Sequence, residues 1–141
     1  MARDNEFIKI RDEFCAELEP KALKANIDCW NFYINSTAEN MKTYETSQDI
    51  VYKLYQNVDL YKKLQELKKE RLADKHLNKQ LKDLEKEFDE ELNAGELKKA
   101  LRDKENEIAG KYNSYIPMID GKEISKAEIG KILQNQKDIT I

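Results

Sequence analysis

A helix boundary lies in the stretch Cys29-Trp30-Asn31-Phe32-Tyr33-Ile34-Asn35-Ser36-Thr37-Ala38-Glu39-Asn40. Ser36 and Glu39 have the spacing of a capping box, in which the serine hydroxyl accepts a hydrogen bond from the Glu39 amide and the Glu39 carboxylate accepts one from the Ser36 amide. Asn35 is a residue type that favours turns. We therefore predict that one helix ends near Asn35 and that a second helix begins after Ser36.

The residues on both sides of this boundary have the three- and four-residue spacing of amphipathic helices. Pro20 interrupts the first helix and should either kink it or begin its second half. The apolar stripe of the first helix is Phe7, Ile10, Phe14, Leu18, Ala22, Ala25, Cys29 and Tyr33. The second helix is expected to bury Met41, Tyr44, Gln48, Val51, Tyr52 and Tyr55.

Further helices are predicted after residue 57. Asp59 is expected to cap a short helix, Asp74 is expected to cap the next one, and Gly95 is expected to end it in a left-handed conformation. The leucine-rich stripes of these two helices are Leu60, Leu64, Leu67 and Leu72, then Leu77, Leu81, Leu84, Phe88 and Leu92. A further helix after Gly95 is marked by Leu97, Leu101, Ile108, Tyr112 and Tyr115.

The last part of the chain changes character. Asp120-Gly121 stands between short apolar runs, which is a signal for a two-residue hairpin turn, and Ser125 with Glu128 forms a second capping box at the start of a final helix. The sequence therefore predicts an all-α fold of long antiparallel helices in an irregular bundle, with a small β-hairpin near residues 115–124. Residues 1–141 are expected to form one domain.

The composition excludes several classes of function. The 28 acidic and 25 basic residues are interspersed and give a net charge of -3, so a basic nucleic-acid surface is not expected. No apolar run reaches the ~18 residues that a membrane span needs, and the first residues lack the apolar core of a signal peptide. Cys15 and Cys29 would lie about 21 Å apart on one helix, too far for a disulfide. We therefore expect a cytoplasmic protein with two small core cysteines.

The sequence offers no recognised catalytic constellation. The chain has one histidine, His76, so it contains no HExxH zinc motif, and it has no Gly-x-Ser-x-Gly turn or glycine-rich phosphate loop. We name no catalytic, cofactor-binding or metal-ligating residue in this chain.

Two segments nevertheless resemble a known family. A tryptophan followed by an Asn-Ser-Thr-x-Glu-Asn turn, at Trp30 and residues 35–40, is similar to the N-terminal region of angiotensin-converting-enzyme-like and oligoendopeptidase F-like zinc metallopeptidases. Residues 112–125, Tyr-Asn-Ser-Tyr-Ile-Pro-Met-Ile-Asp-Gly-Lys-Glu-Ile-Ser, are similar to a stretch in bacterial members. The resemblance implies a helical region that roofs a substrate cleft, with the zinc motif much later in the polypeptide.

Two functions are therefore open at this point. The first is a non-catalytic N-terminal region that walls or gates the peptide-binding cleft of a zinc peptidase, whose zinc, peptide substrates and remaining polypeptide would be supplied by the whole enzyme. The alternative is a self-contained helical protein–protein interaction module with coiled-coil-like packing. We also expect the chain to form a homo-oligomer through aromatic residues of the first two helices, which are Trp30, Tyr33, Tyr44 and Tyr52. No nucleic acid or membrane partner is expected.

Overall fold

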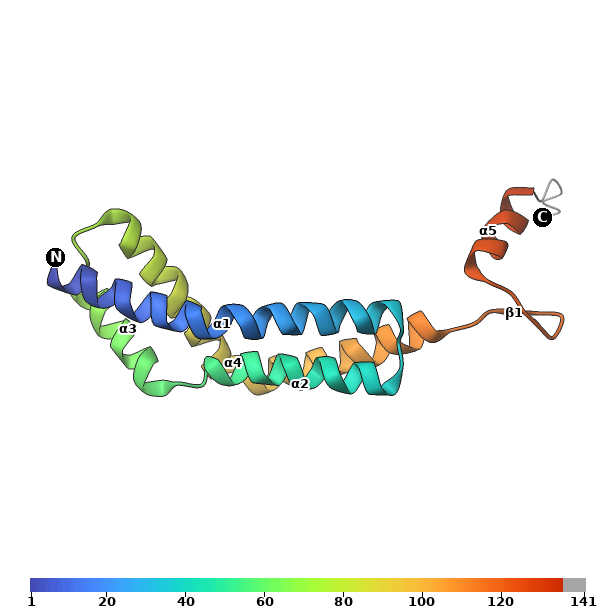
Figure 1. Ribbon diagram of the computed structural model, residues 1–141, viewed down its shortest axis with the longest axis horizontal. Coiled ribbons are helices and arrows are strands. Elements are labelled where there is room, and N and C mark those ends of the chain that lie inside the picture. The colour runs from blue at the N-terminus through green and yellow to red at the C-terminus, as the bar shows by residue number, and fades with distance from the viewer. Residues whose placement is uncertain (136–141) are drawn as a thin grey trace.

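The computed structural model describes residues 1–135 and confirms the all-α class with a small hairpin. The elements are α1 (Ala2–Ile34), α2 (Ala38–Leu54), α3 (Val58–Glu70), α4 (Lys75–Ser114), β1 (Met118–Ile119), β2 (Lys122–Glu123) and α5 (Lys126–Asn135). Figure 1 shows an elongated arrangement in which the long helices α1 and α4 both extend from one end of the bundle to the other. We call the end with α3 the proximal half and the end where α2 lies beside α1 and α4 the distal half.

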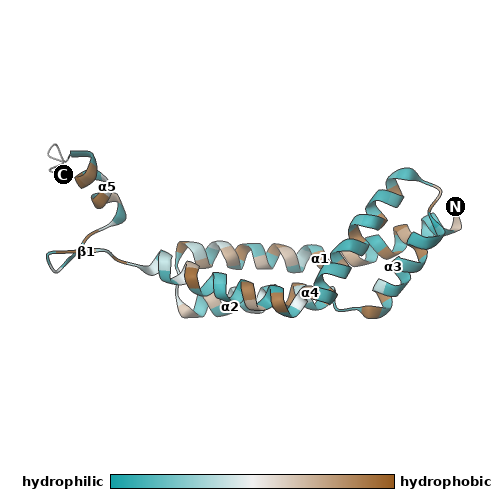
Figure 2. Ribbon diagram, turned by 180° about the vertical axis from the view of Figure 1, so that it is seen from behind, coloured by the Kyte–Doolittle hydropathy of each residue, from teal (hydrophilic) through white to brown (hydrophobic). Residues whose placement is uncertain are grey.

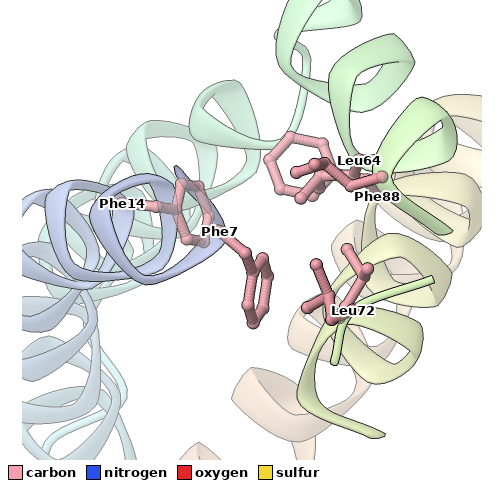
Figure 3. Close-up of a cluster of buried hydrophobic side chains, with 7 residues drawn as sticks. Phe7, Phe14, Leu64, Leu72 and Phe88 are labelled. Carbon is pink, nitrogen blue, oxygen red and sulfur yellow. The ribbon is translucent and has the colours of Figure 1, made fainter. Parts of the chain in front are cut away.

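The proximal half contains the apolar core. Its buried residues come from α1, α3, α4 and the α3–α4 connection, and they are Phe7, Phe14, Leu64, Leu67, Leu72, Leu81 and Phe88. Phe7, Leu64 and Phe88 are completely buried, and Figure 3 shows their side chains converging between the helices. The ring centroids of Phe14 and Phe88 are 5.2 Å apart, a separation typical of favourable aromatic pairs.

Local capping fixes the ends of the proximal helices. The Asn57 side chain accepts from the Leu60 amide at 3.0 Å, so Asn57, rather than the predicted Asp59, caps α3. Asp74 caps α4 as predicted, because its carboxylate accepts from the His76 and Leu77 amides. The buried carboxylate of Asp4 accepts from the Ala73 amide at 2.9 Å, which ties the start of α1 to the α3–α4 connection.

The predicted capping box at the α1–α2 boundary is wrong by one residue. The hydroxyl of Thr37, whose backbone is extended (φ -79°, ψ 157°), accepts from the Asn40 amide at 3.1 Å. Ser36 instead donates its hydroxyl hydrogen bond to the Phe32 carbonyl at 2.9 Å. Ser36 therefore completes the end of α1, and Thr37 begins α2.

Two expected interruptions do not end a helix. α1 continues through Pro20, and in Figure 1 its axis bends near the middle, where proline removes a backbone donor. α4 continues through Gly95, so the predicted stop is wrong. A Cβ atom at Gly95 would lie 2.1 Å from the Tyr52 hydroxyl oxygen. The glycine therefore gives room for the close packing of α2 against α4.

The buried residue at the end of α1 also differs from the prediction. Phe32 is 1 % exposed, whereas Tyr33 is 53 % exposed. Phe32 lies seven residues after the buried Ala25, two turns along the same face, and Tyr33 points about 100° away from it. Cys15 and Cys29 are half-buried rather than buried, and both are free thiols.

Beyond α4 the hairpin and α5 project from the bundle (Figure 1). Met118 pairs with Glu123, and Ile119 pairs with Lys122. Asp120 and Gly121 have φ values of 51° and 77°, as a two-residue hairpin turn with the favoured twist requires. The second capping box is confirmed, because Ser125 and Glu128 exchange hydrogen bonds.

Candidate functional site

The residues with catalytic or metal-binding potential are dispersed in the structure. His76 is exposed in the first turn of α4. Within residues 1–135, no group of three or more histidine, cysteine, aspartate or glutamate side chains is arranged to hold a metal ion.

The distal half is notable because buried polar side chains, namely Asp28, Ser47 and Asn106, lie between its three helices. Asp28 of α1 is buried, accepts from the Lys24 ammonium at 2.7 Å, and also accepts from the Ser47 hydroxyl of α2. These two donors, with Lys24 contributing most, hold the pKa of Asp28 below its ordinary value. Asp28 therefore remains ionised and joins α1 to α2.

A second polar group joins α2 to α4. Asp49 accepts from Lys99 at 3.1 Å and from the Arg102 guanidinium at 2.7 Å. Buried Asn106 donates to the Gln48 side-chain oxygen at 3.1 Å. An ion pair with one partly buried partner stabilises the fold more than a fully exposed pair does, although the loss of hydration of the charges offsets part of the electrostatic attraction. The distal helices are thus held together by directed polar contacts as well as by apolar packing.

A pocket of about 280 Å³ lies among α1, α2 and α4 beside this network. Ala25, Tyr44, Tyr52, Glu91 and Arg102 are among its lining residues. The buried Nε atom of Arg102 has no hydrogen-bond partner among the described protein atoms. The lining carries one positive and one negative side chain, so the pocket does not select for ligand charge.

The outer face of α1 in the distal half is apolar. We define the α1 outer face as Leu23, Ile27, Trp30 and Ile34, whose side chains are 61 %, 51 %, 67 % and 66 % exposed. At about 100° per residue these four positions fall within roughly 60° of arc. The buried residues Ala25 and Phe32 lie on the opposite side of the helix. The distal part of α1 is therefore apolar on the side that faces away from the bundle.

The distal part of α4 has the same arrangement. We define the α4 outer face as Leu97, Leu101, Ile108, Tyr112 and the C-cap residue Tyr115, each more than half exposed. These positions also fall within roughly 60° of arc, opposite the buried Gly95 and Asn106. The spacing of these residues predicts a helix, as observed, but the face that they form points to solvent rather than into the bundle.

The hairpin and α5 add further exposed apolar side chains. Figure 2 shows apolar residues, in brown, along α5, which stands apart from the four long helices. A pocket of about 560 Å³ opens between the hairpin and α5, with Ile119, Ile124 and Ile132 in its lining. Lys126 links α5 to the end of α4, with its ammonium 3.1 Å from the Tyr112 carbonyl oxygen and 4.4 Å from the Tyr112 ring centroid.

These exposed surfaces are the candidate functional site. Large exposed apolar patches on a protein commonly mark interaction sites. Of the aromatic residues expected to mediate self-association, Trp30 and Tyr33 are exposed, whereas Tyr44 and Tyr52 line the pocket inside the bundle. Ile34 stands in the sequence beside Trp30 and Tyr33 as an apolar patch before the helix boundary, whereas Leu23 and Ile27 are not in the prediction, although apolar residues lie on both sides of the helix between positions 22 and 34.

Comparison of the chain with protein-family models, with curated protein sequences and with solved structures finds no match. Among the described residues, no helix combines the length and the apolar character that crossing a membrane requires.

Proposed function

We propose that this chain is the non-catalytic helical N-terminal region of a cytoplasmic zinc-dependent peptidase, where it walls or gates the peptide-binding cleft. Zinc and the catalytic residues would come from the remainder of the enzyme. The sequence similarity around Trp30 and across residues 112–125 motivates the choice of family. The two free cysteines are compatible with a reducing compartment.

The observation that carries the proposal is the α4 outer face. Five large apolar side chains line the exposed side of this helix, while Gly95 and Asn106 occupy its buried side. The burial of apolar surface is the main source of favourable free energy when proteins associate. A helix whose apolar residues face outward obtains this free energy only when further protein covers them. A wall of a larger enzyme would be covered in this way.

The deciding experiment uses the complete polypeptide encoded by the reading frame that contains residues 1–141. We expect an HExxH motif downstream, stoichiometric zinc, and cleavage of a quenched fluorescent peptide that a chelator abolishes. The isolated chain should neither bind zinc tightly nor cleave the peptide. A complete protein without zinc or peptidase activity would overturn the proposal.

A variant pair tests the role of the α4 outer face in that protein. Ile108→Asp should lower the thermal stability and the peptidase activity of the complete protein, because a charge is placed in the covered interface. It should leave the melting of the isolated chain nearly unchanged, since Ile108 is 60 % exposed there. Lys82→Asp, at an exposed position of the same helix, is the matched control and should change neither property.

The alternative is a self-contained helical interaction module. The apolar core of the proximal half favours this alternative, because the chain's own residues bury Phe7, Leu64 and Phe88 completely without a further polypeptide. This alternative predicts that the polypeptide has neither zinc nor peptidase activity and that the chain captures a separate partner through the outer faces.

A further inference from the structure

The segment that forms the α1 outer face is unusually poor in charge. Charged residues make up 38 % of the chain, yet between Leu23 and Ile34 only Lys24 and Asp28 are charged. These two are paired with each other at 2.7 Å, and Asp28 points into the bundle toward Ser47. The exposed side of this segment therefore presents apolar and amide side chains without an unpaired charge.

This composition matches the centre of a protein–protein interface. Interface centres are depleted of charged residues and enriched in aromatic ones, and tryptophan is a frequent hot-spot residue. Aromatic side chains bury about 150–250 Å² each. Trp30 and neighbouring Tyr33 are 67 % and 53 % exposed, so the exposed parts of their side chains would supply part of the ~1,000 Å² that a specific interface needs.

We infer that the α1 outer face binds the α1 outer face of a second copy of this chain, with the two helices antiparallel. The absence of unpaired charge permits a second copy as the occupant, because a neutral apolar face meets its own duplicate without electrostatic repulsion, and the spacing of the four residues favours it. A strongly charged partner would instead lose hydration without gaining a counter-charge.

The spacing of the four residues fixes the register. Leu23, Ile27, Trp30 and Ile34 are separated by four, three and four positions, which is symmetric about a point between Asp28 and Cys29. A two-fold axis at that point places Trp30 opposite Ile27 of the second copy, and Leu23 opposite Ile34. Each large indole then meets a smaller aliphatic side chain, whereas parallel pairing would put Trp30 against Trp30. Such a self-complementary patch is what a two-fold dimer requires.

This inference does not depend on the proposed peptidase, whose supporting surface is the α4 outer face. Its test uses the 141-residue chain, and its outcome leaves the zinc and peptidase assays of the complete polypeptide unaffected. Failure of one proposal is therefore distinguishable from failure of the other.

The chain contains a single tryptophan, and it lies at the centre of the proposed interface. We expect sedimentation equilibrium to detect a dimer. As the protein concentration rises, the fluorescence of Trp30 should shift to shorter wavelength and its quenching by acrylamide should decrease. A chain that remains monomeric, with Trp30 equally quenched at every concentration, would overturn the inference.

Matched variants locate the interface. Ile27→Lys should weaken dimerisation at least tenfold, whereas Ile108→Lys on the α4 outer face should leave it unchanged. Both residues are isoleucines and more than half exposed, at 51 % and 60 %, so neither change should disturb the fold, which circular dichroism can verify. Loss of the dimer in Ile108→Lys with retention in Ile27→Lys would refute the inference.

A mixing experiment tests the register. Ile27→Lys and Trp30→Glu should each be monomeric alone, but a mixture should form a heterodimer in which the introduced lysine faces the introduced glutamate. The intact Trp30 of the first variant then faces the intact Ile27 of the second and reports burial through its fluorescence. Parallel pairing would not bring the lysine and glutamate together, so a mixture that stays monomeric contradicts the antiparallel dimer.

Discussion

At the residue scale, the start of α2 depends on Thr37, whose hydroxyl satisfies the Asn40 amide. Thr37→Ala should lower the free energy of unfolding by roughly 0.5–2 kcal/mol, because it leaves an amide at the helix start without a partner. Thr37→Ser keeps the hydroxyl and should restore most of the loss. Glu39→Ala should have little effect, since no capping bond reaches the Glu39 side chain from Ser36. Urea denaturation of the three variants measures the differences, and a larger loss for Glu39→Ala than for Thr37→Ala would contradict this assignment.

A second residue-scale prediction concerns the two glycines of α4. Gly95→Ala should destabilise the protein by about 1–3 kcal/mol, as overpacking does, because the added Cβ would lie 2.1 Å from the Tyr52 hydroxyl oxygen and 2.6 Å from a ring carbon. Gly110→Ala is the matched control, since its Cβ would meet the Phe32 ring at 3.6 Å, an ordinary contact. That variant should stabilise the helix by roughly 0.5–1 kcal/mol. Thermal melts of both variants should therefore shift in opposite directions.

At the element scale, the polar contacts between α1 and α2 make the distal half sensitive to acid. Lys24 and Ser47 lower the folded-state pKa of Asp28 below its ordinary value of 3.8, so the unfolded chain binds more protons in the range below that value. The contribution of Asp28 to stability is therefore present above this range and is lost as the pH falls through the folded-state pKa.

We expect the wild type to lose more free energy of unfolding between about pH 6 and about pH 3 than Asp28→Asn does, because the amide does not titrate. Glu45 has the opposite effect on the pH dependence of stability. Burial, together with the negative charges of Asp103 and Asp49, raises the pKa of Glu45, so its protonation at low pH removes an unfavourable charge from the folded state. Denaturation of both proteins across this range gives the comparison. Equal pH dependence would mean that the contact of Asp28 with Lys24 and Ser47 does not hold the helices together.

The elements also show what the sequence could and could not predict. The Asp120-Gly121 hairpin and the Ser125 capping box were predictable because each is determined by residues within a few positions. The end of α4 was misplaced at Gly95. A glycine is needed there because a larger side chain would clash with the Tyr52 ring, and Tyr52 is more than forty residues away in the sequence. The α4 outer face shows a related limit, since periodicity identifies an apolar helical face but does not specify which neighbour covers it.

At the scale of the whole molecule, the two halves differ in what holds them together. In the proximal half Lys68 of α3 pairs with Glu85 of α4, and the same stretch of α4 also buries Leu81 and Phe88 in an apolar core. In the distal half α4 is joined to α2 through the pairs of Lys99 and Arg102 with Asp49, without such an aromatic and leucine core among the described residues. Local opening is easier where fewer apolar contacts are lost.

We therefore expect amides of residues 77–92 to exchange with solvent more slowly than amides of residues 97–112. Added salt screens surface ion pairs and should accelerate exchange mainly in the second range. Hydrogen–deuterium exchange with and without salt measures both effects. Uniform protection along α4, independent of salt, would contradict this division.

The continuity of α4 has a mechanical consequence. Its 40 residues form a rod of about 60 Å whose first turns are clamped by the aromatic core and whose last turn leads to the hairpin and α5. The last residue of α4, Ser114, lies 26 residues beyond Phe88, which is about 39 Å at 1.5 Å per residue. A tilt of about 5° at Phe88 would therefore carry the last turn of α4, and the hairpin and α5 that follow it, through about 3 Å. Small repacking around Phe88 would thus be felt by whatever α5 touches.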